Sequence, residues 1–426
     1  MKVFLDMVGC RLNQSEIETF ARQFRLAGHS LASEAESADL VVINTCTVTA
    51  AAASDSRQKV RQAEKSGAVK IIVTGCHATL NPEQFTSLHG SIQVVGNPDK
   101  DSLVPMVLGL PNSMFDRPSI IREPIPGARL RTRAFIKVQD GCDNHCTYCI
   151  TRLARGGGHS RPTSDIIFEV QSALNGGCQE IVLTGVHLGS WGYDLDHPSQ
   201  LHHLVRAILD ATTTPRLHLS SIEPWDIVPE FLDLWQDARL CRHLHLPLQS
   251  GCAATLQCMG RKITPQIYAD VVRQARLAIP GVSITTDVIT GFPGESEDEF
   301  AESLAFVQEM NFAGGHVFTF SPRPGTAASY LPHQINPSIG KHRNAMMRQI
   351  FTQSALAYRQ QYSGQVLSVL WEKATPIDDY HWQLSGLSDN YLRVRATCST
   401  PCQNQIMPVR IITVVPDGLV GEILLT

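Results

Sequence analysis

Three cysteines that lie close together form the most chemically specific pattern in the chain. Cys142, Cys146 and Cys149 are spaced C-x3-C-x2-C on a loop that directly follows a β-like run. Thiolates at this spacing can bind three irons of a 4Fe-4S cluster, which leaves the fourth iron free to bind a substrate molecule. The sequence therefore predicts an iron-sulfur site with one open coordination position.

A zinc ion is the competing interpretation of this loop. His145 lies between two of the cysteines, and three cysteines with one histidine are a known set of structural zinc ligands. We favour the cluster, because a histidine inside the loop does not easily reach the same tetrahedron and zinc sites usually pair two short loops. The two interpretations differ in the metal that the protein would bind.

Three further cysteines each follow a predicted strand near the N-terminus. The strands are expected at residues 3–8, 40–43 and 70–73. Cys10, Cys46 and Cys76 come within a few residues of the strand ends. Helical stretches alternate with these strands, which predicts an open parallel α/β sheet whose sites gather at the carboxyl ends of the strands. Cysteine is often simply buried, so one such position means little; three at equivalent places predict three thiols at one edge.

The rest of the chain predicts two more domains, since 426 residues at roughly 150 per domain give about three. Proline and glycine are frequent over residues 103–129, as in a linker. Six β-like runs then alternate with helical stretches, at residues 134–139, 180–183, 216–219, 243–246, 282–289 and 316–320. This is the pattern of a partial (β/α)6 barrel, whose chemistry sits on the loops after the strands.

The segment 363–426 is rich in β-like runs separated by turn residues, which predicts a small antiparallel β-barrel. The fold class is therefore α/β, with an N-terminal open parallel α/β sheet, a central partial barrel and a C-terminal β-barrel. We expect the domains at residues 1–115, 128–360 and 363–426.

Composition restricts the environment of the protein. Hydrophobic residues make up 43% and charged residues 18%, which argues against extensive disorder. The N-terminus has no secretory signal and no apolar run approaches 18 residues, so we expect a cytoplasmic protein without a membrane partner. In that compartment the 12 cysteines favour metal binding over disulfides. No function is assigned to the remaining six, which are Cys178, Cys241, Cys252, Cys258, Cys398 and Cys402.

Beyond these patterns, the C-x3-C-x2-C loop resembles the signature of the radical S-adenosylmethionine superfamily. Several flanking segments are similar to the methylthiotransferases within it: GCRLNQSE, VINTCTVT, VTGC, KVQDGCDNHCTYCI, IVLTGVHLGS, HLHLPLQSG, TDVITGFPGE and FSPRPGT. GCRLNQSE and QDGCDNHCTYCI resemble the branch that modifies threonylcarbamoyladenosine in tRNA. The resemblance covers nearly the whole chain, and the C-terminal segment looks like a TRAM domain.

This resemblance implies two 4Fe-4S clusters, S-adenosylmethionine and a tRNA substrate. The cluster at Cys142, Cys146 and Cys149 would generate a 5′-deoxyadenosyl radical, and Cys10, Cys46 and Cys76 would hold a second cluster that carries the added sulfur. The product would be the 2-methylthio derivative of the adenosine beside the anticodon, at tRNA position 37. An electron donor such as flavodoxin or ferredoxin would be a partner.

The resemblance also suggests residues that bind S-adenosylmethionine. Thr184 and Gly185 stand where the superfamily uses a main-chain edge to meet the methionyl amino group. Glu223, Gln249 and Asp287 follow later barrel strands and could bond the ribose or the methionyl group. Each has a structural alternative. Glu223 precedes a proline and could only shape a turn, and Asp287 could be a buried carboxylate whose hydrogen bonds are made within the protein core.

Contact with RNA is expected near the barrel cysteines. Residues 122–161 carry eight basic and three acidic side chains, a net charge of +5 in a chain whose overall charge is -4. We expect Arg131, Arg133, Arg152 and Arg155 to meet phosphates. An ordinary solvated face is the alternative. The C-terminal barrel has four basic and six acidic residues, so its role in RNA binding is less secure than the family suggests.

Three other functions stay open at this point. The same chemistry could act on isopentenyladenosine in tRNA or on a side chain of a ribosomal protein. A protein of another class, a non-catalytic iron-sulfur RNA-binding protein, is opposed by the complete barrel motif. The GCRLNQSE segment favours the tRNA branch.

Overall fold

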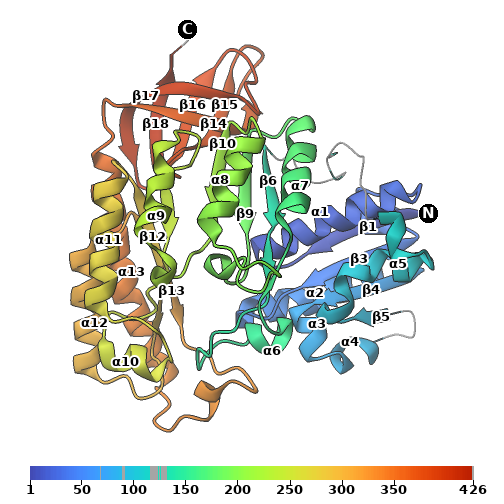
Figure 1. Cartoon of the computed structure of the whole chain (residues 1–426), viewed down its shortest axis with the longest axis horizontal. Helices are drawn as coiled ribbons and strands as arrows, with labels where there is room; N and C mark the ends of the chain where they lie inside the picture. The colour runs from blue at the N-terminus through green and yellow to red at the C-terminus, as the bar shows by residue number, and fades with distance from the viewer. Residues whose placement is uncertain (68, 89–91, 116–122, 124, 126–131, 425–426) are drawn as a thin grey trace. The chain divides into compact units, whose positions relative to one another are not determined.

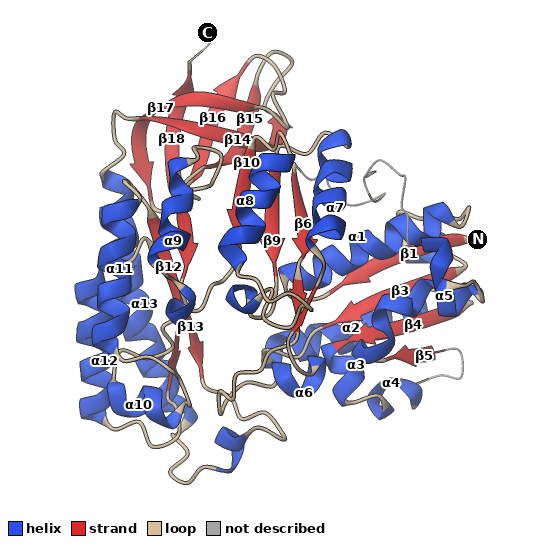
Figure 2. Cartoon of the chain, in the orientation of Figure 1, coloured by secondary structure: helices blue, strands red, loops and turns tan. Residues whose placement is uncertain are grey.

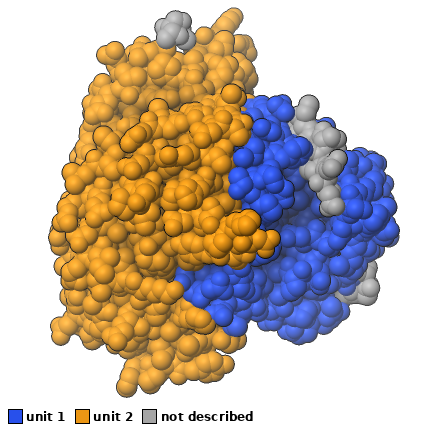
Figure 3. Space-filling model, in the orientation of Figure 1, with its two compact units in different colours: residues 1–144, 149–177, 184–186 blue, residues 145–148, 178–183, 187–426 orange. Residues whose placement is uncertain are grey.

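The computed structural model describes residues 1–67, 69–88, 92–115, 123, 125 and 132–424 (Figure 1). Helices and strands alternate over most of this chain, as expected for the α/β class (Figure 2). The chain forms two compact units, one of residues 1–144, 149–177 and 184–186 and the other of residues 145–148, 178–183 and 187–426 (Figure 3). The division into three domains stays a prediction. Within the described ranges, no helix has the length and apolar character needed to cross a bilayer.

Five parallel strands form the N-terminal sheet in the order β2-β1-β3-β4-β5. Their bounds are β1 (Lys2–Met7), β2 (Ser30–Leu31), β3 (Leu40–Thr45), β4 (Lys70–Gly75) and β5 (Ile92–Val95). The three predicted strands are confirmed as β1, β3 and β4. The structure adds β2 and β5, which are too short to show a pattern in the sequence. Since β1, β3 and β4 are neighbours, their carboxyl ends meet at one edge of the sheet.

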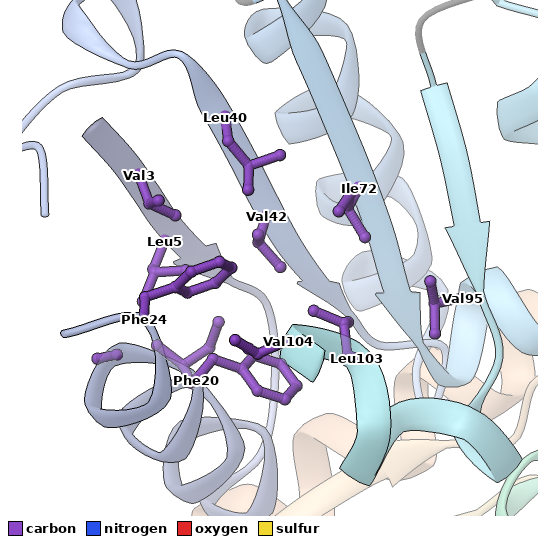
Figure 4. Close-up of a cluster of buried hydrophobic side chains, with 12 residues drawn as sticks. Val3, Leu5, Phe20, Phe24, Leu40, Val42, Ile72, Val95, Leu103 and Val104 are labelled. Carbon is purple, nitrogen blue, oxygen red and sulfur yellow. The ribbon is translucent and has the colours of Figure 1, made fainter. Parts of the chain in front are cut away.

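Helices cover both faces of this sheet, which explains why β3 is buried along its whole length. On one face, Phe20 and Phe24 of α1 (Arg11–Leu26) pack against the strands together with α5 (Leu103–Leu108) (Figure 4). Leu103 and Val104 are fully buried there. The prediction of a linker from residue 103 is therefore wrong for this first part. Pro105 lies in the first turn of α5, where a helix tolerates proline.

The other face of the sheet packs against α2 (Ala50–Lys65). Two short helices follow the strands on this side of the sequence, α3 (Cys76–Leu80) and α4 (Glu83–Thr86). The sheet is thus covered by helices on both faces, and this packing fixes the positions of its strand ends.

All six predicted strands of the barrel region are present. They are β6 (Arg133–Lys137), β9 (Glu180–Thr184), β10 (Arg216–Leu219), β11 (His243–His245), β12 (Ser283–Thr290) and β13 (Gly314–Thr319). The pairs β9 with β10, β11 with β12 and β12 with β13 are parallel. A short antiparallel pair, β7 (Gln139–Asp140) and β8 (His159–Ser160), brackets the loop with the three barrel cysteines.

Helices alternate with these strands. They are α6 (Thr151–Arg155), α7 (Thr163–Asn175), α8 (Leu201–Ala211), α9 (Pro229–Leu232), α10 (Ala253–Cys258), α11 (Pro265–Ala278), α12 (Glu297–Met310) and α13 (Pro337–Gln360). Ser296 is the N-cap of α12 and forms a capping box, in which its hydroxyl accepts from the backbone N–H of Glu299 and the Glu299 carboxylate accepts from the backbone N–H of Ser296.

Five strands close into a C-terminal barrel in the order β14-β15-β16-β18-β17. Their bounds are β14 (Val366–Pro376), β15 (Trp382–Ser388), β16 (Arg393–Cys398), β17 (Ile406–Val415) and β18 (Gly418–Ile423). Trp371 and Leu384 are among the buried side chains of its core. The predicted barrel is confirmed with one difference, because β16 and β18 pair in parallel while the other pairs are antiparallel.

Candidate metal centres

The first candidate centre is the loop that follows β7, and we call Cys142, Cys146 and Cys149 the barrel triad. All three thiols are partly exposed. Gly141, directly before the triad, has a φ of +68°, and a Cβ at this position would lie 1.8 Å from the carbonyl oxygen of Gly157. Only glycine allows such an approach. The local backbone therefore dictates how the chain enters the cysteine loop.

A buried arginine lies beside one cysteine of the barrel triad. Arg261 Nη1 is 4.0 Å from Cys146 Sγ, and the guanidinium stacks 4.6 Å from the ring of Trp225. Glu223 accepts two bonds from Arg261, at 3.0 and 2.7 Å. Burial by itself would lower the pKa of Arg261, but the charge of Glu223 outweighs it and raises that pKa. A cation therefore lies next to the Cys146 thiol.

The second candidate centre is the edge of the N-terminal sheet, and we call Cys10, Cys46 and Cys76 the N-terminal triad. They follow β1, β3 and β4, which are adjacent strands. Cys10 is exposed and the other two are buried. Burial, with smaller contributions from the nearby thiols of Cys10 and Cys76, raises the pKa of the Cys46 thiol to about 11. The three thiols therefore gather at one edge of the sheet.

The backbone and one asparagine hold this edge together. Gly9 has a φ of +105°, and a Cβ there would lie 2.7 Å from Cys46 Sγ. On α1, Asn13 Oδ1 accepts a long bond of 3.7 Å from the Cys10 thiol. Asn13 Nδ2 donates to the carbonyl of Thr45 at 3.2 Å, which ties the end of β3 to the start of α1. This role of Asn13 could not be inferred from the sequence, where only its place in GCRLNQSE singles it out.

Both triads fit iron-sulfur clusters by donor chemistry. Each supplies three thiols, the ligands that iron-sulfur clusters require. Among the described residues, no three His, Cys, Asp or Glu side chains converge to hold a single metal ion. Thiolates also bind zinc, so the donor set by itself fits either metal, and the choice between cluster and zinc stays a prediction.

Thr184 and Gly185, predicted to meet S-adenosylmethionine, lie at the end of β9. The Thr184 carbonyl accepts a bond from the N–H of Val138 at 2.9 Å. A Cβ on Gly185 would lie 3.0 Å from Oε1 of Gln139, so this position packs closely against the strand that leads into the barrel triad. These two residues are therefore near the cysteine loop.

The other three predicted cofactor residues lie at the ends of later strands. Asp287 forms ion pairs with His245 at 3.3 Å and His316 at 3.1 Å. Burial raises the pKa of Asp287, but the hydrogen bonds from both histidines outweigh this effect and lower it well below its usual range. Gln249 has a φ of +74°, and its N–H donates to the Asp287 carbonyl at 2.8 Å. Gln249 and Asp287 are thus adjacent, while Glu223 pairs with Arg261.

The structure revises the expected RNA-binding arginines. Arg155 is only 2% exposed and binds the carboxylates of Glu16 and Asp140, so it offers no free cation to a phosphate and this prediction is wrong. Arg133 and Arg152 are partly exposed. Arg131 lies outside the described residues.

Ion pairs neutralise part of the net positive charge of the segment 122–161. Lys137 binds Asp101 at 2.9 Å, and Arg161 binds Glu169 at 2.7 Å. Asp101 precedes the segment and Glu169 follows it, so a count of charges within the segment overstates its exposed positive charge. Arg122 and Arg129 lie outside the described residues.

Two family descriptions match the chain. Residues 2–96 match an uncharacterised protein family, UPF0004, and residues 136–307 match the radical SAM superfamily. Among solved structures, the radical S-adenosylmethionine methyltransferase TsrM from Kitasatospora setae is similar in fold, with a TM-score of 0.58, 15% sequence identity and coverage of 77% of each chain.

Curated relatives match nearly the whole chain. The threonylcarbamoyladenosine tRNA methylthiotransferase MtaB of Bacillus subtilis is 34% identical, over 96% of this chain and 93% of the relative. The protein of the same name from Thermotoga maritima is 35% identical, over 87% and 86%. The tRNA-2-methylthio-N(6)-dimethylallyladenosine synthase of Alkaliphilus oremlandii is 28% identical, over 99% and 93%.

Proposed function

The chain belongs to the radical S-adenosylmethionine methylthiotransferases, and we propose that it converts threonylcarbamoyladenosine beside the tRNA anticodon to its 2-methylthio derivative. The observation that carries this proposal is the similarity to MtaB proteins, at 32–35% identity over at least 86% of their length. Relatives named for dimethylallyladenosine are 28–31% identical, so that substrate is the second candidate.

We propose that the barrel triad binds one 4Fe-4S cluster and that the N-terminal triad binds another. When bound, these clusters supply the electron that cleaves S-adenosylmethionine and the sulfur that is added to the substrate. The protein supplies the rest. Gly141 and Gly9 set the backbone at the two triads, Arg261 places a positive charge beside Cys146, and Asn13 joins the end of β3 to the start of α1.

We propose that the polar residues at the strand ends position S-adenosylmethionine. Gly185 packs closely against Gln139, which holds the main chain after β9 beside the segment that leads into the barrel triad. Glu223 binds the Arg261 guanidinium and Asp287 contacts His245 and His316, so both carboxylates are held in place with oxygen lone pairs left to accept bonds from a ribose hydroxyl or an amino group. Thr184 would contribute its main chain and Gln249 its side-chain amide.

The remaining partners follow from the reaction. We propose an electron donor such as flavodoxin or ferredoxin, because the cleavage of S-adenosylmethionine needs one reducing electron. We also place the enzyme in the cytoplasm, where its tRNA substrate is found.

The nucleosides of tRNA test the proposed substrate. In cells that lack this protein, mass spectrometry should find unmodified threonylcarbamoyladenosine in place of its 2-methylthio derivative, and expression of the gene should restore the derivative. The levels of methylthiolated isopentenyladenosine should not change. Loss of that nucleoside instead would assign the second candidate, and no change in any tRNA nucleoside would point to a protein substrate.

Arg133 and Arg152 are the described arginines that we propose meet tRNA phosphates. Replacing both by alanine should weaken tRNA binding and flatten the slope of log K against log salt by about 0.7 to 0.9 per lost contact, because each contact releases condensed counterions. Filter binding across a salt series measures both quantities. Arg273→Ala is the control, because this arginine is exposed and lies on α11. An unchanged slope would mean that tRNA binds elsewhere.

A further inference from the structure

Arg155 is a buried arginine at the end of α6, a few residues after the barrel triad. Its Nη1 binds Glu16 at 3.0 Å and both carboxylate oxygens of Asp140, at 2.8 and 2.9 Å. Its Nη2 donates to Oδ1 of Asn13 at 2.9 Å. Asn13, Glu16, Asp140 and the N-terminal triad lie in the same compact unit as Arg155. The segment that follows the barrel triad therefore places a cation beside helix α1 of the N-terminal sheet.

The segment that ends in Arg155 meets the N-terminal triad at two points. Asn13 Oδ1, which binds Arg155, also accepts the long bond from the Cys10 thiol. On the other side, Asn97 Nδ2 donates to the carbonyl of Ala154 at 2.6 Å and lies 3.7 Å from Cys76 Sγ. The Asn13 side chain thus connects the Arg155 guanidinium to the Cys10 thiol. The Asn97 side chain connects the neighbouring Ala154 carbonyl to the Cys76 thiol.

The ionic group around Arg155 has more positive than negative charge. It contains Arg155, Lys100 and Lys137 against Glu16 and Asp140, a net charge of +1. Asp101 also binds Lys137, but this carboxylate is 83% exposed and water screens it.

An uncompensated buried charge is costly, so such a group favours an anion nearby. A four-iron cluster on three thiolates is anionic, and it becomes more so when it is reduced or when its open iron binds hydrosulfide. The excess positive charge beside the N-terminal triad is therefore of the sign that stabilises those states.

From this geometry we propose that Arg155 is a positioning residue that stabilises the reduced and the hydrosulfide-bound forms of the N-terminal cluster. The inference deepens the proposed function and rests on the second cluster proposed there. Reduction potentials of iron-sulfur clusters depend on local net charge and hydrogen bonding. The proposal assigns both effects to a residue that also ties the barrel sequence to the N-terminal sheet.

The test uses the full chain with Cys142, Cys146 and Cys149 replaced by alanine, so that only the N-terminal cluster remains. Anaerobic titration with dithionite, followed by electron paramagnetic resonance, gives the one-electron potential of that cluster. Arg155→Gln should lower the potential, and Glu16→Gln should raise it, since the two changes shift the net charge in opposite directions. Each substitution should change the equilibrium constant for reduction of the cluster about tenfold, which corresponds to a shift in potential of about 59 mV for one electron.

A second readout uses sodium sulfide as the probe. Arg155→Gln should weaken the binding of hydrosulfide by about tenfold, the effect expected from one unit charge at a separation on the order of 10 Å with an effective dielectric constant of about 20. The line shape of the reduced cluster reports this binding. Arg155→Lys keeps the charge and should retain most of the affinity.

Two further variants separate charge from folding. Arg155→Gln combined with Glu16→Gln removes one charge of each sign and leaves no unpaired Glu16 carboxylate. Its potential should return toward that of the parent, the variant in which only the three barrel cysteines are replaced. Arg161→Gln removes a cation whose charge is paired with Glu169, outside the ionic group around Arg155, so it should leave the potential unchanged.

The outcomes distinguish this inference from the proposed function. If the parent variant binds no iron, the second cluster is wrong and the inference fails with it. If the parent has a cluster of about four irons, but Arg155→Gln and Glu16→Gln shift its potential in the same direction or not at all, Arg155 has only a structural role.

Discussion

After anaerobic reconstitution the protein should bind about eight irons, the sum of two four-iron clusters. The variant with alanine at Cys142, Cys146 and Cys149 should keep about half of that iron, because the N-terminal triad follows strands of a five-stranded sheet to which no residue of the barrel triad belongs. Colorimetric iron analysis and inductively coupled plasma mass spectrometry measure the metal content.

The matched control removes the same number of thiols outside both triads. A variant with alanine at Cys258, Cys398 and Cys402 should bind as much iron as the native protein. Native protein that contains zinc and no iron would rule out both proposed clusters. Full iron retention in the barrel-triad variant would show that those cysteines hold no cluster.

Cys46→Ala should still allow reductive cleavage of S-adenosylmethionine to 5′-deoxyadenosine, while the methylthiolated nucleoside disappears. The reason is that this change removes a ligand of the N-terminal triad and leaves Cys146, Arg261 and Glu223 in place. Cys146→Ala should abolish both products. Liquid chromatography with mass detection follows 5′-deoxyadenosine and the modified nucleoside in one reaction with tRNA.

Two controls accompany this experiment. Cys10→Ala and Cys76→Ala should behave like Cys46→Ala, because all three thiols belong to one site in the proposal. Iron analysis should confirm about four irons in each variant. A folded Cys46→Ala variant that keeps the barrel cluster but cleaves no S-adenosylmethionine would overturn this division of labour between the triads.

Local patterns were enough to predict the elements that carry both triads. Alternating apolar strands and helices predict β1, β3 and β4 in parallel, and each of Cys10, Cys46 and Cys76 comes directly after its strand. The spacing of the barrel triad is a property of one loop. Both features depend on residues close together in sequence, where backbone geometry and side-chain chemistry can be inferred without knowing the packing.

The linker prediction failed at α5 for a different reason. Proline at position 105 is typical of a loop, yet it fits the first turn of a helix. Burial of Leu103 and Val104 in the core under α1 makes this short helix stable, and that burial depends on the whole N-terminal layer.

Residue types and their spacing along the chain were sufficient to identify the two sets of cysteines, the class of fold and the family resemblance. The partners of the charged residues, in contrast, depend on how distant segments pack together. Arg155 meets Glu16 across 139 positions, and Arg261 reaches Cys146 across 115. The energy of an ion depends on the charges and the solvent around it in space. A count along the chain therefore made Arg155 an RNA contact, whereas its buried carboxylate partners place it beside the N-terminal triad.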